Sequence, residues 1–170
     1  MRAVAFSLVV LVLSALQGAA GEYRADAACP VIARLSLYIS GVTSFERVDE
    51  CPQIIFSSNA PAAAGPVQDS AALRNIGATY YPATGAILIS PFLDTESVPG
   101  QAVLLHQLVH ARQYAIGMDR GLPCRALLEA QAYAVEARFL EENGYAEEAQ
   151  AARLTGAMRA RCSDEPDQMN

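Results

Sequence analysis

Several residue types and patterns are missing or scarce in this chain of 170 residues, and each absence excludes or disfavours a class of function. There is no lysine, so all 12 basic residues are arginine, and they form no cluster. Because nucleic-acid binding relies on a basic patch, we expect no nucleic-acid partner. The four cysteines include no Cys-x-x-Cys pair, which argues against a cysteine-ligated zinc site. Only two histidines are present, and their positions carry most of what the sequence says about function.

The first twenty residues have the pattern of a secretory signal peptide. Arg2 supplies the positive charge, residues 3–16 the apolar segment, and Gly18–Ala20 a small-residue cleavage site. The apolar segment is shorter than the roughly 20 residues of a membrane span, which disfavours a retained anchor. Cleavage would remove one positive charge and no negative charge, changing the net charge from −6 to −7. We expect a secreted or periplasmic protein that has no membrane contact after cleavage.

The mature chain, residues 21–170, is expected to form a single domain with a polar tail at 162–170. Apolar residues recur with helical periodicity in four segments, namely 30–42, 98–116, 125–142 and 146–161. Asp69 and Ser70 could cap a further short helix that runs to Ile76. Strand-forming residues predict a buried strand within 52–57 and a hairpin of 78–81 and 86–90 around Gly85.

The four cysteines of an exported chain predict two disulfides, for which three pairings are open. The last two predicted helices have similar lengths and a tight Asn143–Gly144 joint, so they should pack antiparallel. Cys124 precedes the first of these helices and Cys162 follows the second, so their ends should meet. This geometry favours Cys124–Cys162, and Cys29–Cys51 follows by elimination.

The two histidines, His106 and His110, lie four residues apart within the sequence His-Gln-Leu-Val-His. On a helix this spacing places both imidazoles on one face, which is the arrangement of two ligands to one zinc ion. The flanking residues are apolar, so we expect the helix to be buried on several sides. The alternative interpretation is a pair of hydrogen-bonded core histidines.

A third metal ligand would have to be a carboxylate, because no histidine remains. Glu129 is the best candidate, since it lies near the start of the next long helix among leucine and alanine. A buried acid in such surroundings is costly unless it is paired or metal-bound. Glu136, two turns later, is the second candidate. Glu129 could instead be an ordinary carboxylate that favours the start of a helix.

Residues 78–140 resemble the gluzincins, the thermolysin-like branch of the zincin metallopeptidases. The likeness rests on His106-x-x-x-His110, on Glu129 within Glu-Ala-x-Ala-Tyr, and on the strand before the histidine helix. The chain is also similar to small exported bacterial zincin-like proteins of unknown function, in which a trailing glutamine corresponds to Gln113. The resemblance implies an α+β fold with a short antiparallel sheet, whose hairpin packs on the active-site helix, and a C-terminal helical hairpin. It also implies one zinc ion held by His106, His110 and Glu129.

Gln107 occupies the position at which the resemblance implies a catalytic glutamate. In this family the glutamate accepts a proton from zinc-bound water and passes it to the leaving amine. The amide of Gln107 has a similar shape but cannot accept that proton at neutral pH. Loss of a general base typically lowers the rate by about 10²–10⁴. We therefore expect a zinc-loaded domain with weak or no hydrolysis.

Other side chains could take part in this site. They comprise acids that could replace the missing base, tyrosines that could polarise a substrate carbonyl, and a glutamine that could support a ligand from behind. These are Glu136, Asp94 and Glu96, then Tyr133, Tyr80 and Tyr81, and finally Gln113. Packed tyrosines and a solvent-exposed glutamine are the alternatives.

Three hypotheses follow. The first is a zinc-binding zincin-like protein, catalytically impaired, that binds a peptide or protein at the former cleft. The second is an active zinc metallopeptidase with a non-standard general base. The third is a structural or interaction domain held by disulfides and free of metal.

Overall fold

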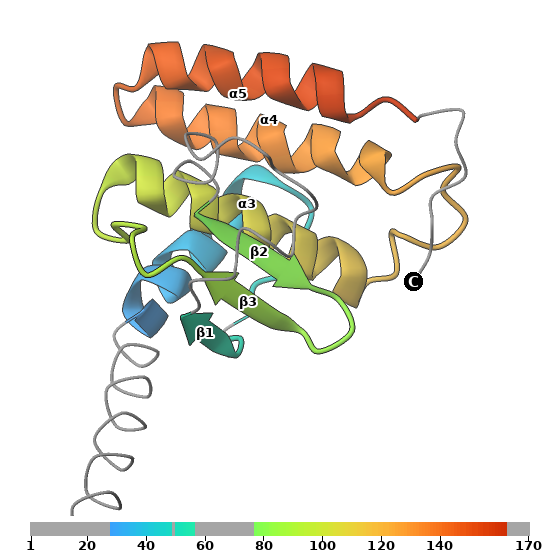
Figure 1. Cartoon of the computed structure of the whole chain (residues 1–170), viewed down its shortest axis with the longest axis horizontal. Coiled ribbons are helices and arrows are strands. Elements are labelled where there is room, and N and C mark those ends of the chain that lie inside the picture. Colours follow the sequence, from blue (N-terminus) through green and yellow to red (C-terminus); the bar gives the residue numbers. More distant parts are fainter. Residues whose placement is uncertain (1–27, 49, 57–76, 163–170) are drawn as a thin grey trace, which may run out of the picture.

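The structure, a computed structural model, describes residues 28–48, 50–56 and 77–162 (Figure 1). The expected signal peptide, the short helix ending at Ile76 and residues 163–170 of the tail lie outside these ranges. The described residues form a mixed α+β domain with four helices and a three-stranded sheet. None of the described helices combines the length and the apolar character of a membrane span.

The helices confirm the segments predicted from periodicity, with ends that differ by at most two residues. They are 28–42, α3 at Val98–Ala115, α4 at Ala126–Glu142 and α5 at Ala146–Arg159. α4 and α5 pack antiparallel as the C-terminal hairpin, and α3 lies between this hairpin and the sheet (Figure 1). The turn between α4 and α5 contains Gly144 at φ +87°. Glycine adopts a positive φ without a steric penalty, which allows the tight turn between α4 and α5.

The sheet has the strand order β1-β3-β2, with β1 at Ile54–Phe56, β2 at Ala78–Tyr81 and β3 at Ala86–Ile89. β2 and β3 form the predicted antiparallel hairpin. The expectation of a wholly antiparallel sheet was wrong, because β1 runs parallel to β3, with Ile54 opposite Ile87. Parallel neighbours need a long connection, which residues 57–85 supply, but strand composition does not reveal the direction of pairing.

The core is built around β3 and α3. Ile87 and Ile89 of the central strand are 0% exposed, and so are Leu104, Leu105 and Val109 of α3. Burial on several sides explains why α3 lacks a clean polar face, and it keeps the axis of the histidine helix in one position.

Both predicted disulfides are present. Cys29–Cys51 joins the first described helix to the segment before β1, and Cys124–Cys162 joins the start of α4 to the end of α5. Closing a loop of 38 residues stabilises a fold by about 4 kcal/mol in the chain-entropy model. The second disulfide therefore restrains the end of the helical hairpin at which Glu129 lies.

The start of α3 is held by a close approach of the preceding loop. Ser97 caps the helix, since its Oγ accepts a hydrogen bond from the Gly100 amide at 3.2 Å and donates one to the Asp94 carbonyl at 2.8 Å. A Cβ atom at Gly100 would lie 1.8 Å from the same carbonyl oxygen. Only glycine fits there, so this contact sets where α3 begins.

Gly100→Ala should therefore destabilise the protein, because the loop backbone would have to move. We expect the free energy of unfolding to fall by about 1–3 kcal/mol, the usual cost of overpacking. Gly41→Ala is the matched control, since no atom lies within 4 Å of a Cβ atom at that helical position. It should be neutral or stabilising by up to about 1 kcal/mol. Urea unfolding measures both, and equal stability of the two variants would contradict the role of Gly100.

Candidate metal centre

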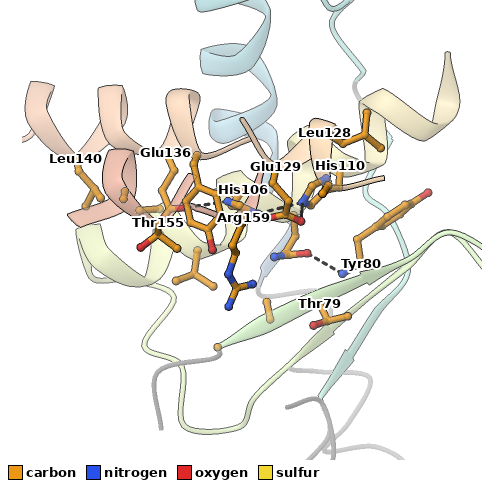
Figure 2. A pocket seen from close by; sticks show the side chains of 18 of the residues that line it. Thr79, Tyr80, His106, His110, Leu128, Glu129, Glu136, Leu140, Thr155 and Arg159 are labelled. Atoms are coloured by element: carbon orange, nitrogen blue, oxygen red, sulfur yellow. Dashed lines mark hydrogen bonds and ion pairs between the residues drawn. The ribbon is translucent and has the colours of Figure 1, made fainter. Parts of the chain in front are cut away.

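His106 and His110 project from α3 toward Glu129, which lies in the first turn of α4 (Figure 2). The two Nε2 atoms are 3.0 Å apart. Nε2 of His106 lies 3.5 Å from Oε2 of Glu129, and Nε2 of His110 lies 3.2 Å from Oε1. Candidate ligand atoms of all three residues lie within 4.8 Å of one another, so the structure brings together the set proposed from the sequence and could hold a metal ion.

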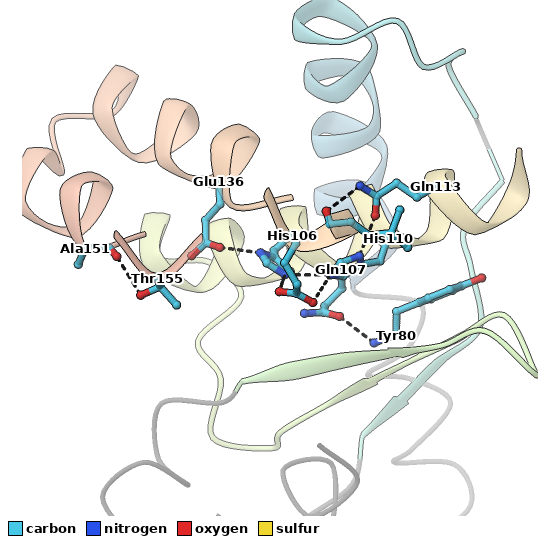
Figure 3. Close-up of polar contacts among 10 residues, drawn as sticks. Tyr80, His106, Gln107, His110, Gln113, Glu136, Ala151 and Thr155 are labelled. Atoms are coloured by element: carbon cyan, nitrogen blue, oxygen red, sulfur yellow. Dashed lines mark hydrogen bonds and ion pairs between the residues drawn. The ribbon is translucent and has the colours of Figure 1, made fainter. Parts of the chain in front are cut away.

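His110 is oriented from behind by a chain of amides (Figure 3). Nε2 of Gln113 donates to the Leu128 carbonyl at 2.9 Å and to Oε1 of Gln131 at 3.0 Å. Because a carbonyl can only accept, the Gln113 oxygen must face His110, whose Nδ1 lies 2.8 Å away. Nδ1 of His110 therefore carries a proton, and in the neutral ring the lone pair is on Nε2.

His106 is oriented in the same way by a carboxylate. Its Nδ1 lies 2.8 Å from Oε2 of Glu136, so it donates its proton to that oxygen. Glu136 thus contacts the side of the ring that faces away from the group, and it is not the third ligand. A carboxylate behind a ligating histidine fixes the tautomer and makes the ring a stronger ligand.

These contacts leave two Nε2 lone pairs facing each other at 3.0 Å. Two acceptors at this distance repel unless a proton or a cation lies between them. Oε2 of Glu129 is buried beside them without a hydrogen-bond partner, which is also costly. A cation shared by the three residues would remove both penalties, so the donor set fits a metal ion.

The electrostatics of the group favour a positive charge at this point. Burial opposes the charged form of His106, but the close contacts with Glu129 and Glu136 and the negative charges of these two carboxylates outweigh it and raise the pKa of His106. Burial also opposes ionisation of Glu129, but the two histidines outweigh it and hold its pKa far below the ordinary value. In the absence of metal, a proton takes the place of the cation.

Gln107 is tied to the sheet rather than directed at the histidines. Its Oε1 accepts a hydrogen bond from the Tyr80 amide at 2.8 Å (Figure 3). On either side of Tyr80, the carbonyl oxygens of Gly77 and Tyr81 accept hydrogen bonds from the amides of Ser90 and Gly85, within the hairpin. Because backbone groups of a strand alternate in direction, the Tyr80 amide points to the outer edge of the sheet, away from β3. Gln107 therefore joins α3 to β2.

A cavity of about 900 Å³ opens beside this group, between β2, α3, α4 and α5. Tyr133 lies on its wall, with its ring 4.4 Å from that of His106 in an edge-to-face contact. Burial raises the pKa of Tyr133 to about 12, against an opposing effect of Arg159. The phenol is therefore protonated at neutral pH and can donate a hydrogen bond into the cavity.

The remaining candidates divide between those on the cavity and those away from it. Tyr80 and Glu136 line it, whereas Tyr81 does not. Asp94 and Glu96 do not line it either, so the suggestion from the sequence that these two acids reach the site was wrong. Asp94 instead accepts a hydrogen bond from the backbone amide of Glu96. Gln113 is 0% exposed, which rules out the solvent-exposed alternative.

Sequence reasoning missed Gln131, which supports Gln113, and Arg159, which lines the cavity from the end of α5. Gln131 lies two residues after the predicted ligand Glu129, and this proximity was the only available signal. Arg159 could have been found by laying the two C-terminal helices side by side, because their antiparallel packing brings the end of α5 next to the start of α4.

These features define a class of protein, a mixed α+β domain with a candidate metal group of two histidines and a glutamate. The family described as a domain of unknown function, DUF6647, matches residues 24–167, and the chain belongs to this family. Comparisons with curated proteins and with solved structures gave no match.

The raised pKa of His106 predicts how the stability of the metal-free protein changes with pH. A raised pKa in the folded state contributes stability that is fully present below the unfolded value of about 6.5 and is lost as pH rises through the folded value. In EDTA, the advantage of the wild type over His106→Gln in the free energy of unfolding should therefore shrink as the pH rises above about 6.5. Urea unfolding at a series of pH values tests it, and a difference that does not change with pH would contradict the assignment.

Proposed function

We propose that this protein is an exported zinc-binding domain of zincin-like type, which keeps the gluzincin metal centre and has lost most hydrolytic activity. The observation that carries the proposal is the pair of Nε2 atoms 3.0 Å apart, both freed of their protons by Glu136 and Gln113 and flanked by Glu129. A hydrogen-bonded pair of core histidines would not need both rings turned in this way.

Zinc is the metal that suits the donor set. Two imidazoles and one carboxylate are a common ligand set of zinc sites that keep one position open for water or a ligand. When bound there, zinc lowers the pKa of a coordinated water and polarises a carbonyl oxygen. The cavity beside the group gives a ligand access to that position.

The residues around the site support a loss of hydrolysis. Gln107 cannot take up a proton, and its oxygen already accepts the Tyr80 amide proton. Glu136, the acid nearest to His106, is committed to Nδ1 of that ring. Without a general base, the cavity is better suited to binding a peptide or protein segment than to cleaving it.

The disulfides support a location outside the cytosol. Two disulfides persist in the oxidising conditions of secreted or periplasmic proteins. Together with the predicted signal peptide, they lead us to propose that the mature domain acts after export, without nucleic acid or membrane as a partner.

Zinc content is the first test. We expect about one zinc per chain in the oxidised, signal-free protein by native mass spectrometry, and none in His110→Ala. Glu129→Gln should weaken zinc binding, whereas Glu141→Gln, another glutamate of α4 whose partner is Arg153, should not. A wild type that binds no zinc would leave a domain with two core histidines and overturn the proposal.

Restoring the glutamate tests the loss of hydrolysis. Gln107→Glu keeps an oxygen for the Tyr80 amide and adds the missing base, so cleavage of a quenched-fluorescent peptide library should rise by about 10²–10⁴ over the wild type. Gln107→Glu combined with His110→Ala is the control and should stay inactive. If the wild type already cleaves at the rate of Gln107→Glu, another residue acts as the general base, and the proposed loss of hydrolytic activity is wrong.

A further inference from the structure

Arg159 lines the cavity from the last turn of α5, and Tyr133 and Glu129 line the same cavity from α4. Figure 2 shows its side chain reaching away from the helix, among the residues that line the cavity. Arg125, the other arginine of the lining, already has an interaction partner. Arg159 thus contributes a guanidinium group to the space beside the metal centre.

The positive charge of Arg159 is not neutralised by any carboxylate of the described residues. Arg153, on the same helix, pairs with Glu141, and Arg138 pairs with Glu142 at 2.8 Å. Arg159 forms no such ion pair in the described part of the chain. The carboxylates of the cavity wall nearest to the metal centre, Glu129 and Glu136, face the histidines instead.

Tight packing of α5 on α4 holds Arg159 close to the metal group. A Cβ atom at Gly156 would lie 2.6 Å from Cβ of Tyr133, so the two helices approach closely at this point. Arg159 lies one turn after Gly156, and its charge acts on the Tyr133 phenol. The ring of Tyr133 in turn contacts His106. One aromatic side chain therefore connects the arginine to the metal ligands.

We infer that the cavity takes a ligand with a carboxylate group, which Arg159 binds while another part of the ligand occupies the metal centre. A guanidinium group matches a carboxylate through two parallel hydrogen bonds, and the Tyr133 hydroxyl supplies a further donor nearby. For a peptide ligand, the group is the free C-terminus or an acidic side chain. This inference rests on the proposed function, because it places the ligand against bound zinc.

The test uses small hydroxamates, because a hydroxamate binds zinc directly. A series carries a carboxylate at the far end of short, medium and long alkyl spacers, and each acid is compared with its matched primary amide by calorimetry on the zinc-loaded protein. At the best spacer length, the acid should bind about five- to tenfold more tightly than the amide. Arg159→Met should abolish this preference and keep the zinc content, whereas Arg153→Met on the same helix should retain the preference.

The outcomes separate the two proposals. Hydroxamates that bind zinc-loaded protein with equal affinity as acid and amide, at every spacer length, would overturn the role of Arg159 and leave the metal site standing. A protein that binds neither zinc nor hydroxamate would overturn both. Peptide hydroxamates ending in a free carboxylate, compared with amidated ones that carry an internal aspartate, then distinguish a C-terminus from an acidic side chain.

Discussion

The approach of two imidazole nitrogens is the constraint on which the rest of the site depends. Nδ1 of each ring donates to a buried acceptor, Glu136 for His106 and Gln113 for His110, so both Nε2 atoms must present lone pairs to one point. Glu129 adds a carboxylate with a buried, unpartnered oxygen at the same point. A fold that holds three acceptors this close, 3.0 Å between the nitrogens, is stable only with a proton or a cation among them.

The surrounding structure keeps these groups in place. α3 is packed on several sides, and its start is set by the contact of Gly100 with the Asp94 carbonyl. α3 is joined to β2 through Gln107, and α4 is held at its first turn by the Cys124–Cys162 disulfide. Gln107 is therefore part of the frame that holds α3 against the sheet.

Local patterns were sufficient for much of the fold and for the candidate ligands. The helices, the hairpin and the pair at i, i+4 follow from periodicity, which depends on neighbours in the sequence alone. The disulfide pairing followed because two helices of similar length and a tight joint leave little freedom. The direction of β1 was predicted wrongly, because strand composition is the same for parallel and antiparallel pairing. The suggestion that Asp94 and Glu96 reach the site was wrong, because the sequence does not show in which direction the loop before α3 turns.

The sequence by itself determined which residues could bind a metal, that glutamine stands between the two histidines at position 107, and where the helices lie. Only the tertiary structure decided which groups contact the side chains of the site. Glu136 contacts His106, the Gln113–Gln131 pair supports His110, and the Tyr80 amide donates to Gln107. It also placed Arg159 on the cavity. The physical reason is that these contacts join residues of different elements, so they depend on the packing of helices and strands and leave no trace in local spacing.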